Sequence, residues 1–310
     1  MRILIELPTW LGDAVMATPA IENIANFQND VEVTLIGSFV SIEALKNHPK
    51  VVKTHVLDKK YPSLVKISME LGSFNVFFSF RSSFRSKFLK LLISSKNKYQ
   101  FNENRYKNRH QVEKYNDFVN ASLSTNFPAG KLLLHNVNSI LKTNNLISGI
   151  NPGASYGSAK RWYPEEFANV AEKLSEKYDI VIFGGPDEIN IANDIEKSLI
   201  AKGVTNFQNL TGKTTISELI NQISALDLFI TGDSGPMHIA AAFQVPTVAI
   251  FGPTKDDETS QWMNDKSTIV KKNLDCQPCM KRTCPLHHHN CMKLIKAPDV
   301  LVAVSSINRS

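Results

Sequence analysis

The chain has 310 residues, 43% of them hydrophobic and 21% charged, a composition that fits a folded globular protein and excludes a disordered chain. No apolar stretch is long enough to span a membrane, and Glu6 and Pro8 interrupt the apolar start of the chain, so we expect no secretory signal and a cytoplasmic protein. The net charge of +6 is uneven: residues 1–147 hold 19 Lys and Arg against 11 Asp and Glu, whereas residues 148–310 hold 16 against 18, which suits a first domain that meets an acidic partner.

Short apolar runs alternate with helical patterns along the first half of the chain. Residues 2–7 predict a buried strand, and a turn then leads into a helix over residues 13–27. The alternation continues with a strand at 31–36, a short helix at 41–46, and strands at 51–57 and 74–80. Strands that are apolar throughout and alternate with helices indicate a parallel sheet covered on both faces.

The same alternation restarts after a polar stretch whose residues 142–145 read as a linker. It predicts strands at 146–151, 179–183, 226–231 and 247–251, and helices at 164–177, 187–201, 216–225 and 236–243. We therefore expect an α/β protein with two Rossmann-like, doubly wound domains, 1–147 and 148–310, that face each other across a cleft. A final helix near residues 299–304 is expected to return to the first domain.

The turn after the first strand carries Gly12 and Asp13. Glycine permits a close approach or a positive φ. Asp13 stands where a helix is expected to begin, and aspartate is a favoured helix N-cap. The functional interpretation is a carboxylate at the mouth of the cleft that acts as a general base. Spacing alone leaves both interpretations open.

The turn after the strand at 146–151 is a run of small residues, including Ser155, that ends in Lys160 and Arg161. Such a loop can fold over phosphates, with backbone N–H groups and a cation neutralising a leaving diphosphate. The GxxxxGK[ST] pattern of a P-loop is absent. A surface loop with incidental basic residues is the alternative.

The turn after the strand at 179–183 contains Gly184 and Gly185 and opens a helix at Glu188. Two glycines allow a ligand to lie close to the backbone. The Glu188 carboxylate would then bind ribose hydroxyls. The alternative is that Glu188 only caps the helix.

The last informative turn runs from Thr231 to His238 and includes Asp233, Ser234 and Gly235. Backbone N–H groups at the start of the following helix would point at an anion, although His238 could simply be packed. The run GDSGP also occurs in serine proteases. We reject a protease here because this serine lies between a strand and a helix of a parallel sheet, and a catalytic triad is defined by geometry.

Two clusters fall outside these turns. The four cysteines lie within 16 residues, at Cys276, Cys279, Cys284 and Cys291, and zinc binding, disulfides and free thiols all remain open. Residues 81–114 hold ten basic residues against two acidic ones, which indicates either a solvated helix face or a docking surface for phosphate and carboxylate groups. Arg81 and Arg85 begin this basic run.

The runs WLGDAVMATPAI, NPGASYGSAKRWYPEEFA and TGDSGPMHIAAAFQVPTVAIFGPT stand in order at matching positions of the predicted topology. Together they resemble the ADP-heptose:lipopolysaccharide heptosyltransferases of glycosyltransferase family 9, over residues 1 to about 300. The AKRW stretch and the segment with CxxC, RTCP and a fourth cysteine are more similar to heptosyltransferase II than to heptosyltransferase I.

This resemblance implies a GT-B fold, with the acceptor in the first domain and the nucleotide-sugar in the second. It implies inverting transfer of L-glycero-D-manno-heptose from ADP-heptose to the inner core of lipopolysaccharide, with no cofactor and no divalent metal. Asp13 corresponds to the general base. Donor binding falls to Ser155, Lys160, Glu188, Asp233, Ser234, Gly235 and His238, and acceptor binding to Gly12, Arg81 and Arg85.

The implied acceptor carries Kdo and heptose on lipid A, whose phosphates and carboxylates match the basic first half of the chain. We therefore expect peripheral association with the inner leaflet of the cytoplasmic membrane, and no nucleic-acid partner. Three alternatives stay open: another GT-B nucleotide-sugar enzyme, either a transferase or an epimerase; a non-catalytic nucleotide-sugar-binding protein; and a serine hydrolase that uses Ser234.

Overall fold

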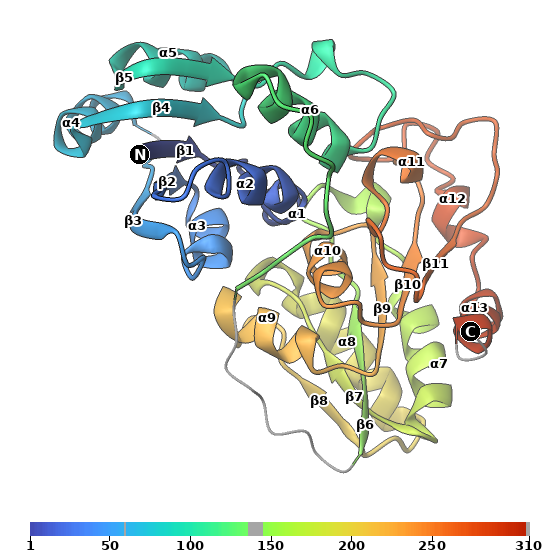
Figure 1. Cartoon of the computed structure of the whole chain (residues 1–310). Coiled ribbons are helices and arrows are strands. Elements are labelled where there is room, and N and C mark those ends of the chain that lie inside the picture. The colour runs from blue at the N-terminus through green and yellow to red at the C-terminus, as the bar shows by residue number, and fades with distance from the viewer. Residues whose placement is uncertain (59, 136–144, 308–310) are drawn as a thin grey trace. The chain divides into compact units, whose positions relative to one another are not determined.

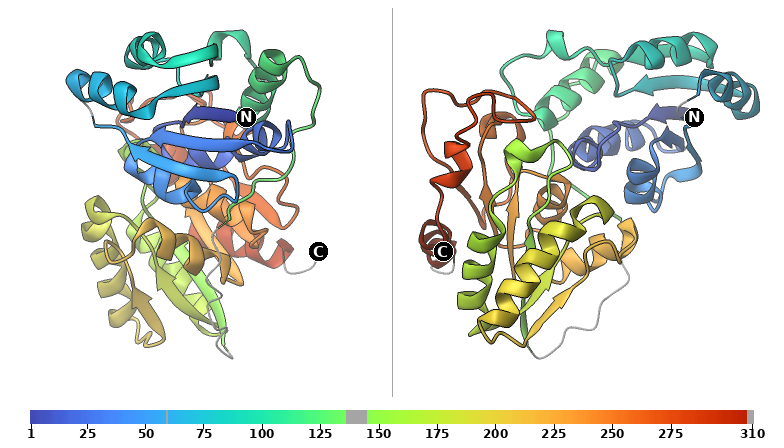
Figure 2. Two further views of the ribbon diagram at one scale, coloured as in Figure 1. Left: turned by 60° about the vertical axis from the view of Figure 1, so that its left-hand side comes forward. Right: turned by 180° about the vertical axis from the view of Figure 1, so that it is seen from behind.

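The computed structural model describes residues 1–58, 60–135 and 145–307, and the chain divides into two compact units, Met1–Asn136 and Val137–Ser310. In each unit, helices cover both faces of a parallel sheet (Figures 1 and 2). The boundary proposed between residues 147 and 148 falls inside a strand, Leu146–Asn151, that belongs wholly to the second unit. Residues 142–144 of the expected linker lie outside the described residues.

Five strands form the sheet of the first unit: β1 (Arg2–Glu6), β2 (Glu32–Gly37), β3 (Val51–Val56), β4 (Ser73–Ser79) and β5 (Ser94–Gln100). They are parallel and lie in the order β3-β2-β1-β4-β5. The apolar runs predicted the first four strands. They did not predict β5, because this edge strand has the polar sequence SSKNKYQ and gains little from burial.

Six α-helices of the first unit cover this sheet: α1 (Leu11–Met16), α2 (Thr18–Ala25), α3 (Phe39–Leu45), α4 (Tyr61–Leu71), α5 (Phe84–Leu92) and α6 (Gln111–Leu123). A short 3-10 turn, η1, spans Glu103–Arg105. α4 and α5 pack side by side on one face, where Leu64 and Leu89 surround Phe77 of β4. The next residue, Phe78, points to the opposite face and meets Phe118 of α6 with ring centroids 6.1 Å apart.

The helix predicted over residues 13–27 is divided into α1 and α2. Pro19 lies in the first turn of α2, where it has no N–H to continue the ladder of α1. The hydroxyl of Thr18 donates to the carbonyl of Val15 at 2.7 Å and so satisfies an acceptor at the end of α1. Thr18 and Pro19 therefore explain the break, which the continuous apolar spacing did not predict.

Six parallel strands form the sheet of the second unit, in the order β11-β10-β9-β6-β7-β8. They are β6 (Leu146–Asn151), β7 (Tyr178–Ile182), β8 (Phe207–Asn209), β9 (Leu228–Gly232), β10 (Thr247–Ile250) and β11 (Ser267–Val270). The helices are α7 (Pro164–Ser175), α8 (Ile189–Ala201), α9 (Ile216–Ser224), α10 (Gly235–Ala242), α11 (Asp256–Thr259), α12 (Asn290–Lys293) and α13 (Ala297–Ile307), with 3-10 turns η2 (Ser158–Lys160) and η3 (Pro186–Glu188).

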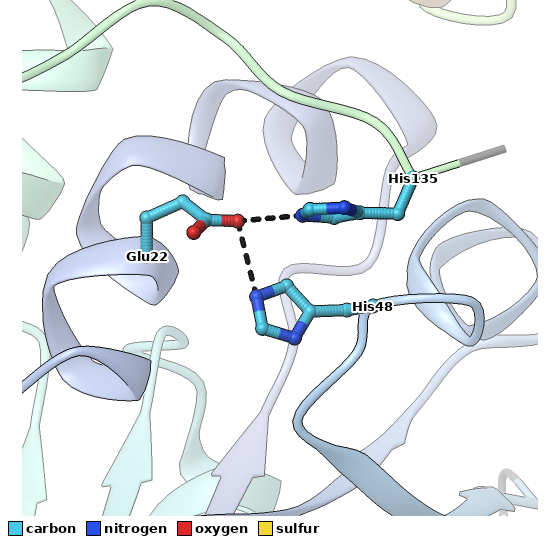
Figure 3. A group of neighbouring side chains, drawn as sticks. All are labelled: Glu22, His48 and His135. Carbon is cyan, nitrogen blue, oxygen red and sulfur yellow. Dashed lines mark hydrogen bonds and ion pairs between the residues drawn. The ribbon is translucent and has the colours of Figure 1, made fainter. Parts of the chain in front are cut away.

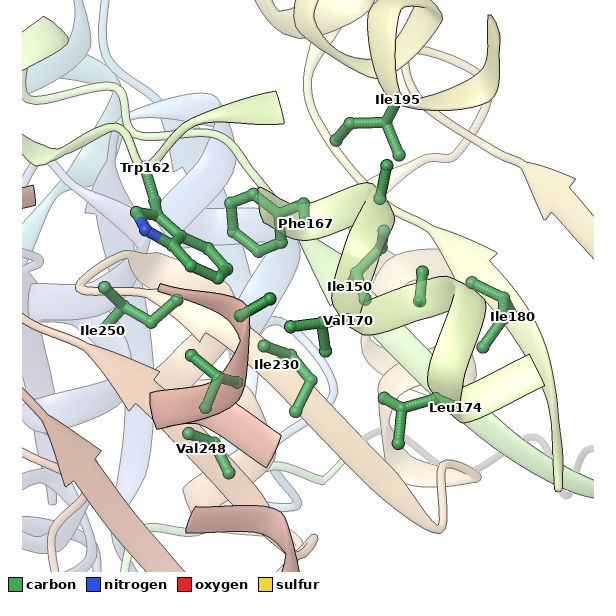
Figure 4. Packing of buried hydrophobic residues seen from close by; sticks show 14 of the residues in the cluster. Ile150, Trp162, Phe167, Val170, Leu174, Ile180, Ile195, Ile230, Val248 and Ile250 are labelled. Atoms are coloured by element: carbon green, nitrogen blue, oxygen red, sulfur yellow. The ribbon is translucent and has the colours of Figure 1, made fainter. Parts of the chain in front are cut away.

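The core of the second unit lies between the sheet and the helices α7, α8 and α13. Figure 4 shows Trp162 and Phe167 beside the aliphatic side chains of the strands. The final helix, α13, packs on α7 and β11 of its own unit. Within the described residues, every helix is too short or too polar to cross a bilayer.

Each sheet has one point where the strand order reverses, between β1 and β4 in the first unit and between β6 and β9 in the second. Loops that leave neighbouring strands in opposite directions open a crevice at such a point, and ligands bind there in doubly wound folds. The turns singled out from the sequence at Asp13, Arg81, Lys160 and Asp233 follow these four strands. The topology therefore places them where a site is expected.

Candidate active site

The turn that leads to Asp13 is fixed by two serines. Ser41 donates to the carbonyl of Pro8 at 2.5 Å, and Ser38 donates to the carbonyl of Thr9 at 2.7 Å. Trp10 is the N-cap of α1 and makes no side-chain cap, so Asp13 lies inside the first turn of the helix and is not its N-cap. The exposed N–H groups of a first turn favour a negative charge at this position.

Gly12 belongs to the same helical turn and does not use the positive φ that a glycine permits. Asp13 also acts on Tyr115, which is buried in α6. Burial first, and then the negative charge of Asp13, raise the pKa of Tyr115 well above its usual value. Asp13 and Tyr115 thus lie on two helices, α1 and α6, that are in contact.

Glu6, the last residue of β1, is completely buried, and we did not predict a role for it. Its two carboxylate oxygens accept from Ser79 at 2.6 Å and from Ser86 at 2.8 Å. Arg81 lies 3.6 Å away and is its charged partner. Burial raises the pKa of Glu6, against the lowering effect of these contacts. The sequence does carry a signal for Glu6: it is a charged residue at the end of an apolar strand, next to the point where the strand order reverses.

Arg81 and Arg85 lie in the segment that follows β4, at the same edge of the sheet as Glu6. The Arg81 backbone carbonyl accepts from the side chain of Gln100 at 3.1 Å. Arg85 is in the first turn of α5 and donates to the carbonyl of Asp58. Burial first, and then the charge of Arg81, lower the pKa of Arg85, so the two guanidiniums lie close enough to interact. The structure therefore brings the two expected acceptor-binding arginines together.

In the second unit, Lys160 and Asp233 form an ion pair with Nζ and Oδ2 2.5 Å apart. The same carboxylate oxygen accepts from Thr254 at 2.6 Å. Lys160 also lies over the ring of Tyr156, 4.8 Å from its centroid. Asp233 and Lys160 come from the turns after β9 and β6, so the pair spans the reversal point of this sheet.

Ser234 is the N-cap of α10 and is joined to the neighbouring strand-end loop through Asn151, whose amide donates to Ser234 Oγ at 3.2 Å. Its other hydrogen bond is with Thr231. Neither partner is a base, so the described contacts do not activate Ser234 as a nucleophile. Among the other expected donor residues, Ser155 is exposed in its loop and His238 is buried in α10.

The Glu188 carboxylate lies against Gly153, and a Cβ at Gly153 would stand only 1.9 Å from Glu188 Cδ. Glu188 accepts from the N–H of Gly185 at 2.7 Å. Burial raises the pKa of Glu188, while this hydrogen bond and the charge of Arg161 lower it. The glycines of two different turns thus make room for one buried carboxylate, a relationship that the sequence did not reveal.

The cysteine-rich segment, residues 276–291, is hydrogen-bonded to the loop after β6 that carries Lys160. The carbonyl of Arg282 accepts from the N–H of Ala159 at 3.0 Å, and the carbonyl of Met280 accepts from Tyr156 Oη at 2.8 Å. His289 Nε2 lies 2.9 Å from the carbonyl of Ala159. Gly157 has a φ of +156° where the loop passes Arg282. This segment therefore fixes the backbone that carries Lys160.

No disulfide joins the four cysteines, Cys276, Cys279, Cys284 and Cys291, in this structure. Burial, and then the neighbouring Cys279, Cys284 and Cys276, raise the pKa of Cys291 to about 11.

Glu22, His48 and His135 form the one group of three His, Cys, Asp or Glu side chains, in the part of the chain described here, whose ligand atoms lie within 4.8 Å (Figure 3). Glu22 Oε1 is 3.0 Å from His48 Nε2 and 2.8 Å from His135 Nε2. His48 Nδ1 accepts from the N–H of Lys50 at 3.1 Å, so its ring proton is on Nε2 and faces the carboxylate. We call these three residues the Glu22 clasp, because the Glu22 carboxylate on α2 contacts both imidazole rings.

Comparison with known proteins identifies the family. The chain matches glycosyltransferase family 9 (heptosyltransferase) over residues 78–290. It is 45% identical over 309 residues to lipooligosaccharide heptosyltransferase 2 of Campylobacter jejuni subsp. jejuni serotype O:2, covering 97% of this chain and 96% of the relative. The corresponding protein of serotype O:6 is 42% identical over 316 residues and 99% of both chains.

Among solved structures, E. coli ADP-heptose lps heptosyltransferase II matches with a TM-score of 0.83 and 20% identity, over 99% of this chain and 98% of that one. E. coli heptosyltransferase WaaC with ADP matches with a TM-score of 0.80 and 14% identity, over 99% and 100%. The protein thus has a GT-B-like α/β fold, with parallel sheets of five and six strands. The chain belongs to glycosyltransferase family 9, the heptosyltransferases, and is an enzyme of that class.

Proposed function

We propose that this enzyme is a heptosyltransferase II, which transfers L-glycero-D-manno-heptose from ADP-heptose to the inner core of lipopolysaccharide or lipooligosaccharide. The high identity to two lipooligosaccharide heptosyltransferases 2, over nearly their whole length, supports this acceptor class. The observation that carries the chemistry is the different charge pattern at the two reversal points. A carboxylate and two arginines follow β1 and β4, whereas an ion-paired lysine and a helix N-terminus follow β6 and β9.

In the proposed reaction, an acceptor hydroxyl attacks the anomeric carbon of the heptose while the bond to the ADP oxygen breaks. Asp13 takes the hydroxyl proton, which makes the oxygen a better nucleophile and contributes about 10²–10⁴ in rate. A single in-line displacement inverts the anomeric centre. Asp13 lies in the first turn of α1, and Ser41 holds the loop before that helix by a hydrogen bond to Pro8. This fixed position supports the role of a general base.

The leaving ADP gains negative charge as the bond breaks. Lys160 and the N–H groups at the start of α10 would stabilise that charge, since cations and helix N-termini are effective anion partners. Asp233 holds the lysine in place, and Glu188, beside Gly153, would bind the ribose. Ser155, Ser234, Gly235 and His238 complete the proposed donor set.

Arg81 and Arg85 would bind the acidic groups of the inner-core acceptor, next to Gly12 and Asp13 in the same edge of the first sheet. Because that acceptor is anchored by lipid A, the enzyme would work at the inner leaflet of the cytoplasmic membrane as a peripheral protein. The charge excess of residues 1–147 supports this arrangement.

The test is incubation of the enzyme with ADP-heptose and lipopolysaccharide acceptors truncated before and after the first heptose, followed by mass analysis of the lipid. We expect the mass of one heptose to be added only to the acceptor that already carries one. Transfer to the heptose-free acceptor would overturn the assignment to heptosyltransferase II. Transfer from a UDP-sugar, or epimerisation without transfer, would favour the alternative GT-B activity.

A further inference from the structure

The outer faces of α4 and α5 carry two apolar stripes. Tyr61, Val65 and Met69 recur at four-residue spacing on α4, and Phe84, Phe88 and Leu91 recur at spacings of four and three on α5. Tyr61 is 46% exposed, Met69 77%, Phe84 79% and Leu91 78%. Large apolar side chains at such exposure, gathered on two neighbouring helices, are unusual for a surface that only meets water.

Most residues of these stripes lie outside the core of the first unit, and of the six only Phe88 packs against it. Both helices already bury a separate inner face on the sheet, through residues such as Leu64, Leu71 and Leu89. Four of the outer residues line an open groove of about 630 Å³ together with Pro62 and Lys66, and these four are Tyr61, Val65, Met69 and Phe88. The rings of Tyr61 and Phe88 meet across it with centroids 5.5 Å apart. Figures 1 and 2 show α4 and α5 side by side on one face of the first sheet.

Basic residues frame the same surface. From Lys60 to Lys98 the chain has eight Lys and Arg and a single acidic residue, Glu70. Lys60, Lys66, Lys87 and Lys96 are exposed. Apolar side chains bordered by lysines are the pattern of a helix that lies on an anionic bilayer, with its apolar side in the headgroup region.

We propose that the α4–α5 surface, defined as the outer faces of these two helices with their flanking lysines, binds the surface of an anionic lipid bilayer. The inference deepens the proposed function, on which it rests for the lipid-anchored acceptor. Arg85 lies in the first turn of α5, so the docking helix itself carries one of the proposed acceptor-binding groups. Charge selects the bilayer over a second copy of the chain, because a symmetric dimer through this surface would set its lysines against each other.

Vesicle co-sedimentation tests the proposal. Wild-type protein should bind vesicles of phosphatidylcholine with phosphatidylglycerol, and bind vesicles of phosphatidylcholine alone much more weakly, with the difference falling as salt rises. The variant Phe84→Ser/Leu91→Ser should bind the anionic vesicles about tenfold more weakly or worse, since each large side chain loses its burial. Lys87→Glu/Lys96→Glu should lose most of the preference for anionic lipid.

Matched controls are Ile200→Ser/Val302→Ser, which removes side chains that are 61% and 70% exposed on helices of the second unit, and Lys173→Glu/Lys197→Glu on α7 and α8. These variants should bind vesicles like the wild type. Equal binding by the α4–α5 variants and the controls would overturn the proposal, as would self-association of the wild type that Phe84→Ser/Leu91→Ser abolishes while vesicle binding persists.

The same variants separate this inference from the proposed function. With a deacylated inner-core acceptor in solution, Phe84→Ser/Leu91→Ser should transfer heptose at the wild-type rate. Absence of transfer by the wild type would contradict the proposed function, whereas the vesicle result does not depend on turnover.

Discussion

Lys160 and Asp233 come from loops more than seventy residues apart, and their charged groups meet at 2.5 Å with side chains that are 12% and 6% exposed. An ion pair this well buried fixes the lysine in one place before any ligand arrives. It also means that a change at Lys160 has two effects, one on the donor and one on the fold, since breaking a buried pair leaves an uncompensated charge.

We predict that Lys160→Gln both destabilises the protein, by about 3 kcal/mol, and raises the donor KM by tenfold or more. The double variant Lys160→Gln/Asp233→Asn should recover most of the stability, because no buried charge remains, while its donor KM stays high. Chemical denaturation and initial-rate kinetics measure the two effects. Lys173→Gln, in an exposed pair with Glu176, is the control for a lysine that only forms an ion pair. A double variant with wild-type donor KM would remove Lys160 from the donor site.

Asp13→Asn should lower turnover by about 10²–10⁴, because the amide cannot accept the acceptor proton. Its affinity for ADP-heptose should stay near the wild-type value, since the proposed donor residues lie in the other unit. Single-turnover rates and equilibrium binding of the donor check the two parts, with Asp30→Asn as an exposed control. Wild-type turnover in Asp13→Asn would exclude Asp13 as the base.

Arg81→Gln/Arg85→Gln should raise the acceptor KM and leave the donor KM unchanged. Neutral substitutions are required here, because a carboxylate at position 81 would stand beside the buried Glu6 and destabilise the fold. Arg105→Gln/Lys107→Gln, at two exposed positions of the same basic run, is the control. An unchanged acceptor KM would support the alternative interpretation, in which residues 81–114 form a solvated surface.

Gly153→Ala should impair donor binding through Glu188. The new Cβ would stand 2.0 and 2.1 Å from the two carboxylate oxygens, so the carboxylate must leave its place. In the background of Glu188→Ala the same glycine change should have little further effect, which is the non-additivity expected of residues in contact. Gly130→Ala, whose Cβ would meet nothing within 4 Å, is the matched control. Additive losses in donor KM would show that Gly153 acts without Glu188.

The Glu22 clasp predicts a pH-dependent contribution to stability. Burial alone would raise the pKa of Glu22, but hydrogen bonds from His48 and His135 lower it below the ordinary value of 4.5. A carboxylate whose folded pKa is lowered stabilises the fold above its unfolded pKa and loses that contribution as the pH falls through the folded value. Glu22→Gln should therefore be less stable than wild type at pH 6, and the difference should shrink below pH 4.5. A difference that is independent of pH would contradict the clasp, and exposed Glu32→Gln is the control.

The sequence predicted those parts of the fold that burial determines. Apolar runs gave β1 to β4 and most of the second sheet, and the turns at Asp13, Lys160 and Asp233 proved to lie at the reversal points. Local chemistry decided the rest. β5 is polar because it is an edge, and Pro19 with Thr18 divides a helix whose apolar spacing looks continuous.

The contacts within the site could not be predicted, because they join residues far apart in the chain. The Glu6 carboxylate accepts hydrogen bonds from Ser79 and Ser86, and these serines approach it only when β4 pairs with β1. Gly153 matters because Glu188 occupies the space beside it. The cysteine-rich segment stood out by composition alone, and only its hydrogen bonds to the loop that carries Lys160 show what it supports.

Calorimetric titration of ADP-heptose into the wild-type enzyme tests the central claim most directly, because every role proposed for catalysis depends on a diphosphate donor held at the β6–β9 reversal point. We predict saturable heat at a stoichiometry near one, competition by ADP, and no comparable heat with a UDP-sugar. A folded, monodisperse protein that gives no heat with ADP-heptose or ADP would contradict the account.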